Sequence, residues 1–94
     1  MATTVVSVAS SATAVTLKAA NTARIGLSIY NKSTANLYVK RGADATVELF
    51  SFMLEPGDFY ELPPLPRGPF AVYPGIVTGI WASANGLAEV TEDS

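Results

Sequence analysis

Residues 24–30 read RIGLSIY, and apolar side chains occupy every second position of this stretch. In an extended chain successive side chains point to opposite faces, so Ile25, Leu27 and Ile29 would share one face and Tyr30 would lie on the other. This period of two is typical of a strand that buries one face, whereas a helix repeats with a period of about 3.6 residues. The stretch therefore predicts a half-buried β-strand.

The rest of the chain repeats this design of short strand-type runs between turn residues. Asn31–Thr34 is a turn-rich break that predicts a hairpin between the strands on either side of it, and Asn85-Gly86 is a pair favoured in type I′ hairpins. Pro56-Gly57 is a turn dipeptide whose glycine can supply a positive φ. We expect about eight or nine strands, at residues 3–9, 14–18, 24–30, 35–40, 45–54 (one long or two short strands), 58–62, 70–73, 76–83 and 87–92.

This spacing of strands predicts one domain, residues 1–94, with an all-β fold. The expected architecture is an antiparallel β-sandwich that is jelly-roll-like or a Greek key. Pro63–Pro69 holds four prolines, which donate no ladder hydrogen bonds, so this segment should cross between sheets or form an exposed loop. The expected core is Ile25, Leu27, Ile29, Leu37, Val39, Ile80 and Val90 together with their neighbours.

The composition argues against catalysis and against several classes of partner. The chain has no Cys and no His, which removes thiolate ligands, the usual general base and the commonest metal ligand. The net charge is −2 and the basic residues are scattered, so we expect no nucleic-acid partner. No run approaches the ~20 apolar residues of a membrane helix, and no signal peptide is evident. We therefore expect a protein that is not an enzyme, uses no cofactor and binds no membrane.

One acidic group needs separate consideration as a site. Glu55, Asp58 and Glu61 lie within seven residues of one another around the Pro56-Gly57 turn. Clustered carboxylates can bind calcium or act as a glycosidase pair. Acidic residues beside a turn are more often solvated, however, and the sequence lacks a calcium-loop motif. We expect no metal site here.

Nearly half of the residues are apolar and 15% are charged, which predicts apolar surface left for a partner. The candidate interaction surface comprises two tyrosines opposite the apolar strand faces and the centre of the proline-rich segment, namely Tyr30, Tyr38, Pro64, Leu65, Pro66 and Arg67. The PxxP spacing in that segment fits a structural crossover better than an SH3 ligand. Exposed tyrosines can anchor a subunit interface, which we favour, or stack on sugars. The alternative to an assembly protein is therefore a carbohydrate- or host-receptor-binding module that uses Tyr30, Asn36 and Tyr38.

Several segments occur in an order that resembles a known group of proteins. They are residues 19–31 (AANTARIGLSIYN), 37–39 (LYV), 54–63 (LEPGDFYELP), 77–82 (VTGIWA) and 86–92 (GLAEVTE). Together they resemble the small β-domains of structural proteins of tailed bacteriophages, of the head-decoration or fibre-base type. Pro63–Pro69 is richer in proline and Phe50–Leu54 richer in aromatic residues than that pattern, which marks both as contact surfaces particular to this chain.

The resemblance implies a bacteriophage virion structural protein, most readily a capsid decoration or a head- or collar-associated protein that acts by protein–protein assembly. The implied partners are the major capsid protein or other virion proteins, and further copies of the chain. We expect a homo-oligomer, with a trimer favoured. The implied location is the virion, after synthesis in the host cytoplasm. The resemblance assigns no role to any single residue.

Overall fold

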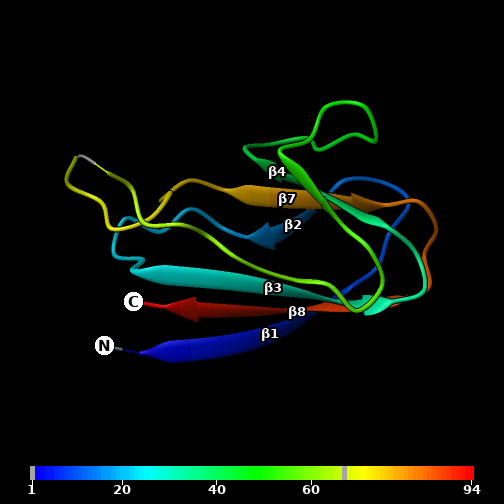
Figure 1. Cartoon of the computed structure of the whole chain (residues 1–94), viewed down its shortest axis with the longest axis horizontal. Helices are drawn as coiled ribbons and strands as arrows, with labels where there is room; N and C mark the ends of the chain where they lie inside the picture. The colour runs from blue at the N-terminus through cyan, green and yellow to red at the C-terminus, as the bar shows by residue number, and fades with distance from the viewer. Residues whose placement is uncertain (1, 67) are drawn as a thin grey trace.

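The computed structural model describes residues 2–66 and 68–94, which form eight strands and no helix (Figure 1). Most strands lie close to the positions that the sequence predicts, with ends shifted by a few residues. The strands are β1 (Thr3–Ala9), β2 (Val15–Lys18), β3 (Gly26–Ser33), β4 (Leu37–Arg41), β5 (Phe52–Leu54), β6 (Phe59–Glu61), β7 (Val77–Trp81) and β8 (Gly86–Asp93).

These strands form two four-stranded sheets, in the orders β1-β8-β3-β6 and β2-β7-β4-β5. Strand β4 pairs with β5, β3 with β6, β2 with β7 and β1 with β8, and every pair is antiparallel. The pairs are nested, as in one long hairpin with β4 and β5 at its tip that has been wrapped around the core. This nested order is jelly-roll connectivity. The predicted antiparallel β-sandwich is therefore confirmed.

Both local hairpin predictions are wrong. Strand β3 pairs with β6 and β8, whereas β4 pairs with β5 and β7, so the two strands belong to different sheets. Strands β7 and β8 are likewise in different sheets, and Asn85-Gly86 therefore closes no hairpin. The expected break at Asn31–Thr34 starts later, because β3 continues to Ser33. A turn signal marks where the chain changes direction, but it does not determine whether the next strand stays in the same sheet.

Two predicted strands are wholly or largely loop. Residues 70–73 form no strand, and of residues 45–54 only Phe52–Leu54 does so. Val72 and Ala45 are buried although they lie outside the strands, whereas Val47, Leu49 and Phe50 are exposed loop residues. The described residues of the proline-rich segment, 63–66 and 68–69, lie in the loop that crosses from β6 to β7, as predicted.

The core lies between the sheets and contains five of the seven residues expected there, namely Leu27, Ile29, Leu37, Val39 and Val90. Ile25 is wrongly placed in the predicted core, because β3 begins after it and Arg24 is the side chain that is buried at this end. Ile80 is also misplaced. It stands opposite Tyr38 on the outer side of its sheet, while its neighbour Trp81 is 1% exposed and fills the core.

Candidate functional site

One end of the sandwich is built around the buried side chain of Asn31. Its Nδ2 donates hydrogen bonds to the carbonyl oxygens of Ala35 and Leu54, each at 2.9 Å. Its Oδ1 accepts hydrogen bonds from Ser33 Oγ at 2.7 Å and from Trp81 Nε1 at 3.3 Å. Asn31 lies in one sheet, while Leu54 and Trp81 lie in the other. The amide therefore fixes the β3–β4 corner and joins the two sheets.

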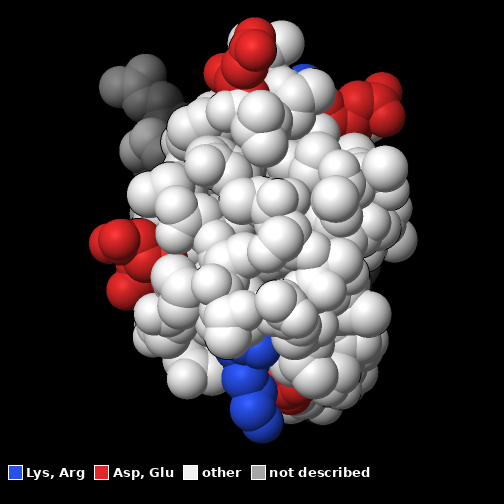
Figure 2. Space-filling model, turned by 90° about the vertical axis from the view of Figure 1, so that its right-hand side faces the viewer, with Lys and Arg blue, Asp and Glu red and all other residues white. Residues whose placement is uncertain are grey.

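An open pocket of about 490 Å³ lies at this corner. Hydroxyl, amide and backbone groups line it together with one aromatic ring, and its residues are Tyr30, Asn31, Lys32, Ser33, Thr34, Gly57, Asn85 and Gly86. Three of the loops at this end, residues 10–14, 34–36 and 82–85, contain Ser, Thr, Ala and Asn alone. Figure 2 shows that this end of the molecule is largely uncharged. Lys32 is the one charged residue among the described residues of the lining, so the pocket offers mainly hydroxyl, amide and backbone groups to a ligand.

A second feature is an apolar patch on the outer side of the other sheet. We call it the β4–β5 surface and define it as Tyr38, Val47, Leu49, Phe50 and Met53. Tyr38 packs edge-on against Phe50, with ring centroids 4.9 Å apart, and stands opposite Met53 in the β4–β5 ladder. The exposed fractions are 67% for Leu49, 48% for Val47 and 40% for both Phe50 and Met53. Tyr38, Phe50 and Met53 are thus neighbours, and Val47 and Leu49 are solvent-exposed apolar side chains on the loop that also carries Phe50.

The loop that carries this surface, residues 42–51, is anchored to the sheet beneath it. The backbone N–H of the buried Ala45 donates to Thr78 Oγ1 at 3.1 Å, and Thr78 Oγ1 donates in turn to the carbonyl of Gly42 at 2.7 Å. Within the loop, Thr46 Oγ1 accepts the N–H of Leu49 at 2.8 Å. Because these bonds hold both ends of the loop tip, Val47 and Leu49 are presented in a defined arrangement.

The structure separates the residues of the predicted interaction surface. Tyr30 and Tyr38 lie on the outer sides of opposite sheets, so no single ligand face contains both. Tyr30 is instead next to Phe59 of β6, which is 61% exposed. Pro64, Leu65 and Pro66 lie in the β6–β7 loop at the end of the sandwich opposite the Asn31 pocket (Figure 1), and Arg67 lies outside the described residues.

Of the three acidic residues around Pro56-Gly57, Asp58 acts as a turn residue, while Glu61 lies in β6. Asp58 Oδ2 accepts the backbone N–H of Glu55 at 2.9 Å, which caps the turn, and Gly57 has the positive φ of 86° that the dipeptide predicts. Within residues 2–66 and 68–94, no three acidic side chains come together in a way that could hold a metal ion.

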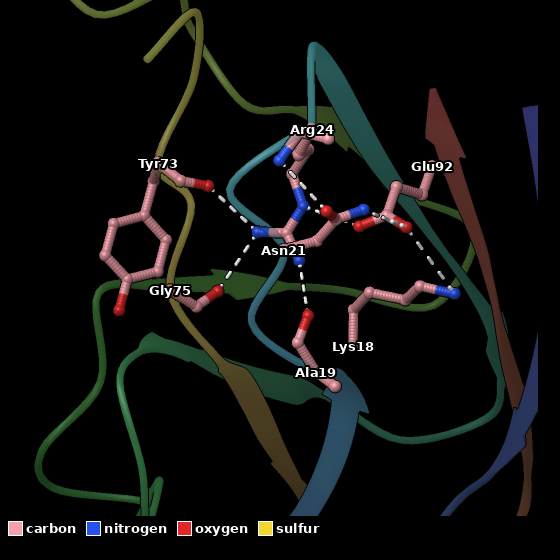
Figure 3. Close-up of polar contacts among 8 residues, drawn as sticks. Lys18, Ala19, Asn21, Arg24, Tyr73, Gly75 and Glu92 are labelled. Carbon is pink, nitrogen blue, oxygen red and sulfur yellow. Dashed lines mark hydrogen bonds and ion pairs between the residues drawn. The ribbon is translucent and has the colours of Figure 1, made fainter. Parts of the chain in front are cut away.

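Arg24 and Glu92 form a buried ion pair that the sequence did not predict (Figure 3). Arg24, 1% exposed, donates from Nε to Glu92 Oε2 at 2.7 Å. Its Nη1 donates to the carbonyls of Tyr73 and Gly75 at 2.8 and 3.0 Å, and its Nη2 to the carbonyl of Ala19 at 2.7 Å. In this way one side chain connects the β2–β3 loop, the β6–β7 loop and β8.

This ion pair is structural, because every guanidinium nitrogen of Arg24 donates to Glu92 or to a backbone carbonyl of the same chain. Among the described residues, no buried side-chain nitrogen or oxygen lacks a hydrogen-bond partner. Arg24 is the first residue of the RIGLSIY stretch, one position before the apolar alternation begins at Ile25, and its position in the sequence carries no signal of burial.

Comparison with models of known families, with curated proteins and with solved structures finds no match to this chain. No helix in the described part of the chain is long and apolar enough to cross a membrane.

Proposed function

We propose that this chain is a structural protein of a bacteriophage virion, a capsid decoration or head- or collar-associated protein that binds other virion proteins and further copies of itself. The observation that carries the proposal is the β4–β5 surface. It places four large apolar side chains, each at least 40% exposed, on one anchored loop and the adjoining strand. Exposed apolar patches of this kind mark protein contacts.

Two further features support an assembly role. The jelly roll is a fold that viral capsid proteins use, although a fold alone does not define a function. Burial of apolar surface contributes about 25 cal/mol per Å², so a contact of modest area becomes effective when many copies bind the same lattice. The bacteriophage assignment itself comes from the resemblance of the sequence segments.

The test is incorporation into virions of the phage that encodes the chain. A tagged copy is supplied during infection, virions are purified on a density gradient, and the tagged chain is measured by quantitative immunoblot. The wild-type chain should co-purify with virions, and Leu49→Asp should reduce its incorporation at least about tenfold, since it places a charge in an apolar contact. Phe59→Asp, which introduces the same charge at a similarly exposed position on the opposite sheet, is the matched control and should incorporate normally. Absence of the wild-type chain from purified virions would refute the proposal.

A second candidate function, the binding of a carbohydrate or host receptor, is favoured by the Asn31 pocket. The hydroxyl and amide groups of its lining can hydrogen-bond a sugar, and the ring of Tyr30 can stack on it. A glycan array would support this function through reproducible binding that Tyr30→Ala abolishes and Tyr38→Ala retains, because Tyr30 lines the pocket and Tyr38 lies on the other sheet. Binding that both variants lose equally would argue against the pocket.

A further inference from the structure

Strand β1 is an edge strand with one side unpaired. It pairs with β8 along its whole length, from Thr3 opposite Asp93 to Ala9 opposite Leu87, and no described strand pairs with its other side. Among the sheet edges, β1 has 7 residues, β5 and β6 have 3 each, and β2 has 4 with an irregular register. The edge that β1 presents is therefore much longer than the others.

The sequence of this edge lacks the features that keep edge strands from pairing. Natural edge strands are commonly protected by charged residues, proline, bulges or short length. Residues 3–9 read TTVVSVA, with neither charge nor proline, and their register with β8 is unbroken. Val5 is 60% exposed, and Val6 is 42% exposed even though it stands opposite the buried Val90 on the core side of the sheet. The core side of β1 is thus partly uncovered.

The backbone hydrogen bonds define which groups of β1 point outward. Ala2 exchanges both backbone hydrogen bonds with Ser94, and the N–H of Ser10 donates to Gly86. Residues of an antiparallel pair alternate between hydrogen-bonded and non-hydrogen-bonded positions. Even-numbered residues of β1 therefore bond to β8, and the outward N–H and C=O groups belong to Thr3, Val5, Ser7 and Ala9.

We propose that β1 pairs antiparallel with β1 of a second copy, about a two-fold axis at Val6, and so joins the two four-stranded sheets into one continuous sheet. This register places Val5 opposite Ser7 of the second copy and Thr3 opposite Ala9, and all of these residues have outward-facing backbone groups. It uses the full length of the strand and brings no like charges together. The two Val6 side chains meet on the axis as a close non-hydrogen-bonded pair, an arrangement that favours contact between β-branched residues.

The contact is isologous, so it closes at a dimer. It differs from the trimer that the sequence analysis favours, which needs a head-to-tail contact around a three-fold axis. The inference does not depend on the virion assignment, because it concerns the free chain in solution.

The first test measures the mass of the purified chain by sedimentation velocity across a wide concentration range. The wild-type chain should form a dimer. Val5→Pro should raise the dimer dissociation constant by about tenfold or more, because it removes an outward N–H donor and places a ring where the second strand approaches. The fold should tolerate this change, since the Val5 N–H points away from β8. Val5→Ala keeps the donor and should remain dimeric.

The second test uses the absence of cysteine from the chain. Val6→Cys introduces one thiol per copy, and on the proposed axis the two Cα atoms would be about 4.5 Å apart, within the range for a disulfide. Mild oxidation should therefore yield a covalent dimer on non-reducing gels. In Val8→Cys the same register separates the two positions by about 13 Å along the strands, so little cross-linked product should form.

A wild-type chain that is monomeric at every concentration, or a trimer, would overturn the proposal. Dimerisation that Val5→Pro leaves unchanged, or cross-linking that is equal for Val6→Cys and Val8→Cys, would also overturn it. These results are separable from the virion test, because a chain that dimerises through β1 could still be absent from virions.

Discussion

Replacement of Arg24 by methionine should destabilise the fold by about 3 kcal/mol. Removal of one partner of a buried ion pair typically costs about 3–5 kcal/mol, because the remaining charge is left desolvated. Glu92 is 6% exposed and would lose its 2.7 Å hydrogen bond from Arg24. The lower end of that range applies, since Asn21 Nδ2 at 3.3 Å and Lys18 Nζ at 3.8 Å remain near the carboxylate. Native domains are stable by about 5–15 kcal/mol, so this loss is a large fraction of the total.

Urea denaturation monitored by the fluorescence of Trp81 gives the free energy of unfolding of each variant. The denaturation midpoint should fall while the slope with urea stays constant, as expected for a change in stability alone. Lys18→Met is the matched control. Its side chain is 22% exposed and makes a longer contact with Glu92, so the expected cost is below about 1 kcal/mol.

The double variant Arg24→Met with Glu92→Leu separates the cost of a stranded charge from the value of the pair. It should be more stable than Arg24→Met alone, because no buried carboxylate remains. An Arg24→Met variant less than about 1 kcal/mol below the wild type, or a double variant whose loss equals the sum of the two single losses, would refute this reasoning.

Other predictions concern the end of the sandwich near Asn31. Gly86→Ala should cost more stability than Gly57→Ala: both glycines have positive φ, but a Cβ at Gly86 would lie 2.7 Å from the carbonyl oxygen of Lys32, whereas a Cβ at Gly57 meets nothing within 4 Å. Urea unfolding compares the two, and equal losses would contradict the steric argument. Asn31→Leu should destabilise by about 3 kcal/mol, since it leaves buried donors and acceptors unpaired; wild-type stability would contradict this. Trp81, at 1% exposure, should show blue-shifted emission and weak acrylamide quenching in the native chain, and in Asn31→Leu the emission should move to shorter wavelength through loss of the Nε1 hydrogen bond.

Much of the fold could be predicted from local alternation. The pattern around Leu27 and Ile29 places both residues in the core, as found, and the Pro56-Gly57 turn has the backbone that its sequence indicates. The alternation also misplaced Ile25 in the core, because Arg24 is buried there by the carbonyls of Tyr73 and Gly75 in a loop distant in the sequence. These carbonyls come close to Arg24 only when the chain folds, so the sequence on either side of Arg24 gives no sign that its side chain is buried.

The candidate sites were less predictable than the strands. The sequence drew attention to the aromatic run of residues 50–54, and Phe50 and Met53 do form part of the β4–β5 surface. It grouped Tyr30 with Tyr38, however, which the sandwich separates onto opposite sheets. The Asn31 pocket was missed, since its lining comes from three chain segments that meet at one end of the sandwich.

The sequence by itself determined that the chain forms short strands and which side of most strands is buried, because the period of two is a local property of extended backbone. It did not determine which strands pair. Strands β3 and β4 are separated by a turn suited to a hairpin, yet each finds its partners elsewhere and the two lie in different sheets. Only the tertiary structure decides this, because pairing depends on how the buried faces of all the strands cover one another and on contacts such as those of Asn31 that join one sheet to the other.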